Sequence, residues 1–179
     1  LMGVALLVGT WVEQGTARAP AAQWLGRLAA FASLGLASGL FYTGWVFFWQ
    51  DYPRGANPGA SVLLLVLYAC AVAPLGALLG LWFKDRERAL QVLLLTALPM
   101  AFLSGFSWPV EAMDAPLQAL RWCIPSTAAI QASLRLNEMG APWQAVAWHM
   151  ALLVAVGVLA TTATVLLARV RLPASHVRR

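Results

Sequence analysis

The segment GASVLLLVLYACAVAPLGALLGLWF, residues 59–83, decides the class of fold. It contains no charged side chain, and it is longer than the roughly 20 apolar residues that a helix needs to cross a bilayer. A charge at the centre of such a helix costs roughly 2.5–3.5 kcal/mol on insertion scales, which explains why none is present. The segment therefore predicts a membrane-spanning helix.

Similar runs occupy residues 28–49, 89–106 and 145–168, and a shorter one occupies residues 1–11. Hydrophobic residues make up 61% of the chain and charged residues 11%, whereas a soluble domain carries about 25% charged residues. Most of the surface must therefore face lipid. We predict an all-α, polytopic membrane helix bundle with one partial and four full spanning helices.

The opening run, residues 1–11, is too short to span a bilayer. No basic segment and no small-residue cleavage site precedes it, so it does not have the pattern of a signal peptide. We expect it to be the end of a longer helix. Residues 1–179 are then the C-terminal part of a transmembrane domain.

The basic residues lie mainly in alternate connections between the runs, which must share one side of the membrane. One side receives Arg18, Arg27, Lys84, Arg86, Arg88, Arg169, Arg171, Arg178 and Arg179, and the other receives Arg54, Arg121 and Arg135. The positive-inside rule assigns the larger group, and with it the C-terminus, to the cytoplasm. Membrane orientation also explains the net charge of +5 better than nucleic-acid binding does.

The polar connection before the last run is long, yet too apolar for a loose loop. We predict two short amphipathic helices at the outer face, within residues 114–138. Asp114 caps the first helix, with Pro116 in its first turn. Pro125 ends that helix, and Ser126 or Thr127 caps the second.

Two glycine pairs have the spacing that allows helices to pack closely. They are Gly35 with Gly39 and Gly76 with Gly80. Small residues four positions apart let two backbones approach each other. Glycine is also common in membrane helices, so both readings of the pairs stay open.

Several kinds of chemistry find no support in the sequence. There is no GxxxxGK[ST] phosphate loop, so we do not expect the chain to hydrolyse nucleotide itself. His149 and His176 lie far apart without paired ligands, and Cys70 and Cys123 have no metal-ligand neighbours, so no metal or cofactor is predicted. The spanning runs also lack the mid-depth ionisable residue that proton-coupled carriers usually need.

The segments FLSGFSWPVEAM (102–113), IPSTAAIQ (124–131) and LNEMGA (136–141) together resemble the signature of type-2 ABC transporter permeases (ABC-2). In that family an apolar helix ends in a Ser-Gly pair, and a Pro, a Met and short outer helices follow. The resemblance implies an outer gate formed by Ser104, Gly105, Pro109, Met113 and Pro125. Leu117, Leu120 and Ile124 are expected to fold the first outer helix back onto the bundle as a lid; a fixed hairpin without a gating role is the alternative.

A second resemblance lies in the first connection. Glu13-Gln14-Gly15-Thr16 is similar to the Glu-x-Gly-Thr element of the family's first cytoplasmic loop, although the spacing to Pro20 is shorter than usual. By this resemblance the residues that couple the permease to the ATPase are Glu13, Gly15, Thr16 and Arg18. An ordinary polar turn, with Gly15 as its flexible residue, is the alternative.

The resemblance implies a six-helix permease half in a bacterial plasma (inner) membrane, with the first span and an outer domain preceding residue 1. Its expected partners are a separate ABC ATP-binding subunit, which binds the ATP, a second permease half in a homo- or heterodimer, and a periplasmic adaptor protein. The expected function is export of a drug-like, lipid or polysaccharide substrate, including multidrug efflux. One alternative is a membrane scaffold or assembly subunit. Another is a lipid-modifying enzyme that uses Glu111 or Asp114, for which no nucleophile or metal cluster is found.

Overall fold

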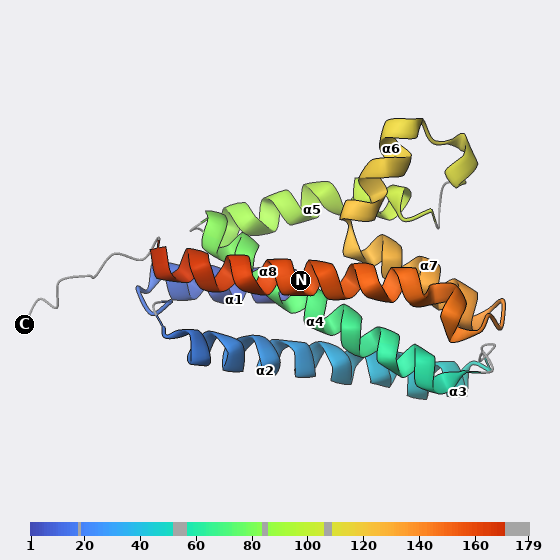
Figure 1. The fold of residues 1–179 in the computed structure, drawn as a ribbon. Coiled ribbons are helices and arrows are strands. Elements are labelled where there is room, and N and C mark those ends of the chain that lie inside the picture. The colour runs from blue at the N-terminus through green and yellow to red at the C-terminus, as the bar shows by residue number, and fades with distance from the viewer. Residues whose placement is uncertain (18, 52–56, 84–85, 106–108, 171–179) are drawn as a thin grey trace, which may run out of the picture.

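The computed structural model describes residues 1–17, 19–51, 57–83, 86–105 and 109–170, and all regular structure in these ranges is helical (Figure 1). The longer helices are α1 (Met2–Glu13), α2 (Ala21–Leu40), α4 (Pro58–Phe83), α5 (Arg86–Leu103), α7 (Pro125–Asn137) and α8 (Ala147–Val170). The shorter segments are a π-helix (Phe41–Val46), α3 (Phe47–Trp49), α6 (Ala115–Leu120) and 3₁₀ turns at Val110–Ala112, Arg121–Cys123 and Trp143–Val146.

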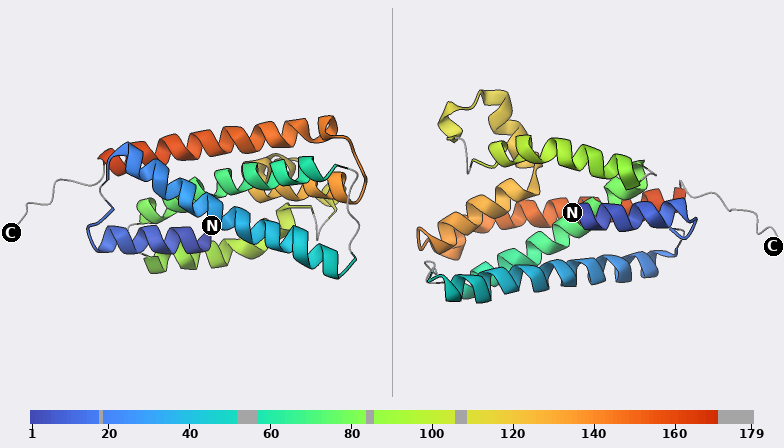
Figure 2. Two further views of the ribbon diagram at one scale, coloured as in Figure 1. Left: turned by 90° about the horizontal axis from the view of Figure 1, so that it is seen from below. Right: turned by 180° about the vertical axis from the view of Figure 1, so that it is seen from behind.

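Helix α4 lies at the centre of the bundle and contacts α1, α2, α5, α7 and α8 (Figures 1 and 2). The α1–α2 turn, the end of α4 and the end of α8 gather at one end of the bundle (Figure 1). The end of α3 and the α7–α8 connection lie at the opposite end. This arrangement agrees with the predicted alternation of the connections between two sides.

Three helical segments are long and apolar enough to cross a membrane: Ala21–Val46, Pro58–Phe83 and Trp143–Arg169. The structure therefore confirms an all-helical, multi-pass architecture, but it does not confirm four full spans. The fourth predicted span corresponds to α5, an 18-residue helix that begins with Arg86, Glu87 and Arg88 and ends at Leu103. These three charges in its first turn leave an apolar stretch that is too short to cross a bilayer. Helix α1, at 12 residues, is too short to span, as predicted.

The second predicted span begins earlier than the sequence indicated. Its helix starts at Ala21 rather than at residue 28 and continues through the π-helix and α3 to Trp49. The first turns bury Trp24 and Leu28, and the Arg27 guanidinium lies over aromatic rings. An arginine in that position therefore does not end the helix. The π-helical turn, a feature often found at functional sites, was not predicted.

The main core lies where α4, α7 and α8 meet, and small residues from each helix allow close packing. Its buried members include Leu64, Ala71, Ala128, Ala132, Leu136 and Leu153. The buried Thr164 hydroxyl of α8 donates a hydrogen bond to the Pro74 carbonyl of α4 at 3.0 Å. A hydrogen bond of this kind between membrane helices contributes about 0.6 kcal/mol on average.

The two outer helices behave differently from each other. Helix α7 packs on α4 and α8, whereas α6 projects away from the bundle (Figure 1). Asp114 is the N-cap of α6, as predicted, although its side chain makes no capping hydrogen bond. The predicted caps of the second helix are wrong: α7 begins at Pro125, and Ser126 and Thr127 lie inside it. Proline suits the first helical position because it lacks the backbone N–H that would have no partner there.

Candidate functional site

The turn after α1 has the geometry of a helix-ending Schellman motif. The Thr16 amide donates to the Trp11 carbonyl at 2.8 Å, and the Gly15 amide donates to the Val12 carbonyl at 3.1 Å. Gly15 has a φ of 70°, a conformation that favours glycine. Of the predicted coupling residues, Glu13 is the last residue of α1 and Gly15 and Thr16 form the turn, while Arg18 lies outside the described residues.

The start of α2 closes over this turn. Arg27 donates to the Thr16 carbonyl at 3.5 Å, and its guanidinium lies 4.4 Å from the centre of the Trp11 ring. Ala17 is fully buried against α2 and α4, in a cluster with Trp24. The connection between α1 and α2 is therefore shorter than the polar segment that the sequence predicts, residues 12–27, and it is more tightly packed. From the sequence, Arg27 stood out only as a topological charge and as part of Leu25-Gly26-Arg27, which resembles the family's residues before its next helix.

At the opposite end of the bundle, α5 stops at Leu103 and the chain turns sharply. Ser104 is buried, and its hydroxyl donates to the Ala101 carbonyl at 2.6 Å. The Ser104 carbonyl accepts a hydrogen bond from the Gln131 side chain of α7 at 3.0 Å. Gly105 follows with a φ of 77°. The backbone of this break is thus covered by protein, as a helix end at membrane depth requires.

The space around Gly105 is tightly filled. A Cβ atom at this position would lie 2.9 Å from Gln131 Nε2, 2.9 Å from Val110 Cγ2 and 3.5 Å from Arg121 Nη1. A side chain at Gly105 would therefore meet both strain in the backbone and steric overlap. At this break, the end of α5 is therefore in contact with α7 and with the 3₁₀ turn before α6.

The other predicted gate residues lie along the same connection. Pro109 is exposed and precedes the 3₁₀ turn, and Met113 is buried. The Met113 carbonyl accepts a hydrogen bond from the Gln118 side chain at 2.9 Å. Pro125 is buried at the start of α7. Residues 106–108 lie outside the described residues, so the structure brings together Ser104 and Gly105 but does not describe their link to Pro109.

Helix α6, which the sequence predicts as a lid, does not pack its apolar face on the bundle. Leu117 is 42% exposed and Leu120 is 52% exposed, so the apolar face of α6 is not folded back onto the bundle. Gln131, which bonds to the break through the Ser104 carbonyl, was not predicted as a site residue. The available signal was Gln131 itself, the single amide side chain in the segment IPSTAAIQ (124–131), because a buried amide needs hydrogen-bond partners.

The two glycine pairs lie at two different crossings of α4. Gly76 and Gly80 face α1, where added Cβ atoms would lie 2.8 and 2.7 Å from the carbonyl oxygens of Leu1 and Ala5. Gly35 and Gly39 of α2 face α4 more loosely, with added Cβ atoms 3.7 Å from Ala69 Cβ and 3.1 Å from Leu65 Cδ2. Gly157 of α8 crosses α4 at Ala71.

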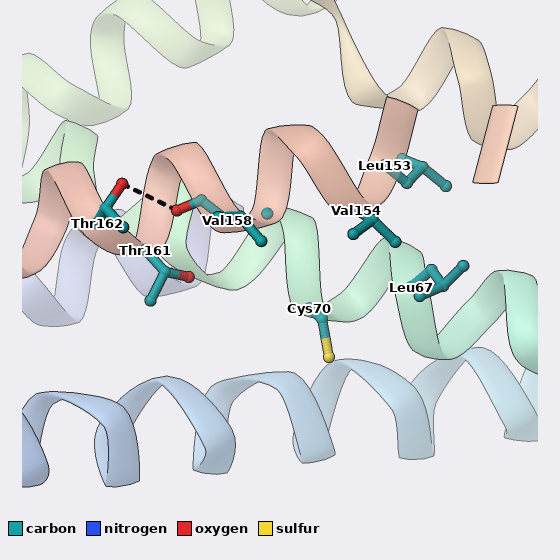
Figure 3. Close-up of a pocket in the computed structure, with 8 residues that line it drawn as sticks. Leu67, Cys70, Leu153, Val154, Val158, Thr161 and Thr162 are labelled. Atoms are coloured by element: carbon teal, nitrogen blue, oxygen red, sulfur yellow. Dashed lines mark hydrogen bonds between the residues drawn. The ribbon is translucent and has the colours of Figure 1, made fainter. Parts of the chain in front are cut away.

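Two apolar grooves hollow the sides of the bundle. One, of about 330 Å³, lies between α4 and α8 and is lined by Leu67, Cys70, Val154 and Thr161 among others (Figure 3). The Thr162 hydroxyl at its edge donates to the Val158 carbonyl at 3.0 Å (Figure 3). The other, of about 440 Å³, lies between α1, α2 and α4. Both are open rather than enclosed, so neither resembles a closed small-molecule site.

Metal ligands do not gather in the described part of the chain: no three His, Cys, Asp or Glu side chains there are placed to hold an ion. Cys70 and Cys123 are both exposed free thiols. His149 is buried beside Trp122, with 5.5 Å between ring centres, and neither of its ring nitrogens has a hydrogen-bond partner.

The apolar helices around α4 define a multi-pass membrane protein. Its sequence matches the family described as ABC-2 family transporter protein over residues 17–166. The chain belongs to this family, and it is therefore a membrane permease of an ABC transporter, which implies an ATP-binding partner. No match was found among curated proteins or among solved structures.

Proposed function

We propose that this chain is the membrane-spanning subunit of an ATP-driven exporter, with ATP bound and hydrolysed by a separate subunit. The observation that carries the proposal is the family match over residues 17–166. Two features of the structure support it. A capped turn and a broken helix lie at opposite ends of one bundle, and both are in contact with helices that pack on α4.

The α1–α2 turn is proposed as the contact for the ATPase. Closure of the ATP-binding subunits presses on this turn, and the close packing of α1 on α4 passes the displacement into the bundle. A ligand shifts a conformational equilibrium only through contacts that differ between the two states. Here the differential contact is the one between Glu13–Thr16 and the nucleotide-bound ATPase.

The break after α5 is proposed as part of the outer gate. Gln131 of α7 holds the Ser104 carbonyl in the present state. Movement of α7 relative to α5 would exchange that hydrogen bond for another and open a path past Gly105. The unpacked apolar face of α6 is then available to cover the opening from outside.

The proposed cargo is a drug-like, lipid or polysaccharide molecule, moved out of the cytoplasm of a bacterial cell across its inner membrane. The open apolar grooves support a partly apolar cargo or a lipid boundary. A second permease half, identical or related, completes the pathway, and a periplasmic adaptor protein is a further proposed partner.

The gate is tested by Gly105→Leu in the permease assembled with its ATPase. We expect assembly and ATP hydrolysis to persist while export is lost, because the new side chain overlaps Gln131 and Val110 in a strained backbone. The measurement is transport alongside ATP hydrolysis in proteoliposomes. Gly59→Leu is the control, since the space beside Gly59 at the same end of the bundle is open. Normal export by an assembled Gly105→Leu protein would rule out this gate.

The orientation is tested by thiol labelling in a background without Cys70 and Cys123. Ala17 is unsuitable because it is fully buried, whereas Gln14 is exposed on the same turn. We expect an impermeant reagent to label Asn57→Cys but not Gln14→Cys in intact cells, and to label both after permeabilisation. The reverse pattern in intact cells would place the α1–α2 turn outside and remove the basis for ATPase contact.

A further inference from the structure

Arg27 lies beside two tryptophan rings at the end of the bundle that carries the α1–α2 turn. Its guanidinium lies 4.4 Å from the centre of the Trp11 ring of α1 and 5.4 Å from that of the Trp24 ring of α2. The two indoles meet edge to face, with 6.3 Å between ring centres, and Phe31 stacks on Trp11 at 5.7 Å. A cation between aromatic faces is attracted to both, more strongly when water is excluded.

The same side chain also reaches the turn through one long hydrogen bond. Arg27 Nη2 donates to the Thr16 carbonyl at 3.5 Å, and Thr16 itself is tied to the end of α1 through the Trp11 carbonyl. Arg27 therefore contacts three parts of the chain at once: the last turns of α1, the connecting turn and the start of α2. In the described structure, no other side chain is shown to make contacts of this kind with all three.

Packing alone does not explain the choice of arginine. Arg27 Nη1 and Trp24 Nε1 are buried without a hydrogen-bond partner, and each such unpaired donor is unfavourable for the folded state. A leucine would fill much of the same space without that cost. The guanidinium is held by the two rings and by its one hydrogen bond to the turn, contacts that a leucine cannot reproduce.

We propose that Arg27 is a positioning residue that clamps α1, the α1–α2 turn and α2 into one rigid unit, so that pressure on the turn moves both helices together. The inference rests on the proposed function, because it concerns how the ATPase contact is transmitted. Without the clamp, the turn yields locally and the displacement is lost before it reaches α4. From α1 the displacement passes on to α4, because α1 packs backbone to backbone on α4 at Gly76 and Gly80.

The experiment uses the full permease with its ATP-binding subunit in nanodiscs, with spin labels at Gln14→Cys and Gln23→Cys in a background without Cys70 and Cys123. Both positions are exposed and lie on either side of the clamp. We expect the distance between the labels to stay unchanged when the complex is trapped with ATP and vanadate. In Arg27→Gln, we expect the distribution to broaden on trapping and the stimulation of ATP hydrolysis by the permease to fall about tenfold. That factor corresponds to about 1.4 kcal/mol of coupling.

Three further variants separate a clamp from a general loss of structure. Arg27→Lys keeps the charge but not the planar guanidinium, and we expect it to restore part of the stimulation. Trp11→Leu removes the ring that Arg27 covers and is expected to behave like Arg27→Gln. Arg135→Gln, an exposed arginine at the other end of the bundle, is the matched control and is expected to behave like the unmodified protein.

The outcomes distinguish the clamp from the proposed function. Unchanged label distances and unchanged stimulation in both Arg27→Gln and Trp11→Leu overturn the clamp and leave the proposed function standing. A permease that keeps Arg27 and Trp11, and that neither cross-links to the ATPase through Gln14→Cys nor, without that cysteine, stimulates it, overturns both. Broadening in Arg27→Gln with partial recovery in Arg27→Lys supports the clamp.

Discussion

The two crossings of α4 by α1 and by α2 carry the same sequence motif but differ in how closely the backbones approach. At the α1 crossing, glycines Gly76 and Gly80 lie against the carbonyl oxygens of α1 itself. At the α2 crossing, Gly35 is in ordinary contact with the Ala69 side chain of α4, and Gly39 lies against the end of the Leu65 side chain, which can move. A backbone atom cannot rotate away as the end of a leucine side chain can. The first crossing is therefore fixed by its glycines, and the second tolerates change.

This difference also separates two mechanical roles. A crossing that cannot widen transmits a displacement between its helices, because packed cores are stiff. At the α2 crossing the contacts are looser, so that side chains there can adjust when the helices move together. The bundle thus pairs a rigid α1–α4 contact with a looser α2–α4 contact.

The largest expected effect is that of Gly80→Leu. The new Cβ would lie 2.7 Å from the Ala5 carbonyl oxygen and 2.9 Å from Val8 Cβ, so α1 must leave α4. We expect a loss of about 3 kcal/mol of stability, the upper end for overpacked cores. Unfolding in detergent micelles measures it, with Gly59→Leu as the control in open space. A Gly80→Leu protein as stable as the control would show that the α1–α4 crossing is not close-packed.

An intermediate effect is expected from alanine at the paired positions Gly76 and Gly35. Gly76→Ala places a methyl group 2.8 Å from the Leu1 carbonyl oxygen, whereas Gly35→Ala places one in ordinary contact with Ala69, at 3.7 Å. We expect Gly76→Ala to destabilise by about 1–2 kcal/mol and Gly35→Ala to stay within about 0.5 kcal/mol of the unsubstituted protein. Thermal unfolding of both variants checks the contrast, and equal losses would remove the distinction between the crossings.

The smallest effect is expected from a double-mutant cycle at Gly39 and Leu65. Gly39→Ala meets only the end of the Leu65 side chain, at 3.1 Å. We expect the single change to cost about 0.5 kcal/mol and Leu65→Ala to relieve it, giving a measurable interaction between the two sites. The same cycle with Gly76→Ala and Leu65→Ala should be additive, because these residues lie far apart along α4. Additivity in both cycles would mean that Leu65 does not limit the α2 crossing.

The outer segment shows where sequence patterns were sufficient and where they failed. Asp114 and Pro116 located the start of α6, since capping and proline geometry are local properties. The prediction that Ser126 or Thr127 caps α7 was wrong because Pro125 itself begins the helix. That α7 packs into the bundle while α6 stands apart depends on the shape of α4 and α8, which no local pattern contains.

The local backbone at two of the predicted site residues agrees with the motifs, whereas the contacts of these residues were not predicted. The motifs marked Gly15 and Gly105, and both have positive φ values in the structure. The residues that bond to these turns lie on other helices: Arg27 is on α2, 11 residues from Thr16, and Gln131 is on α7, 27 residues from Ser104. The coupling, gating and packing roles assigned to these residues remain predictions that the experiments above test.

By itself the sequence determined the helical membrane class, the approximate limits of the apolar segments and membership of a transporter family. The length of an apolar run and the local backbone preferences depend only on which residues follow one another. The tertiary structure alone decided which glycines lie against backbone atoms, which outer helix packs on the bundle, and that Arg27 lies beside two tryptophans. Those properties depend on the distance between helices. That distance is set by the packing of many side chains at once, so identical motifs at residues 35–39 and 76–80 acquire different physical roles.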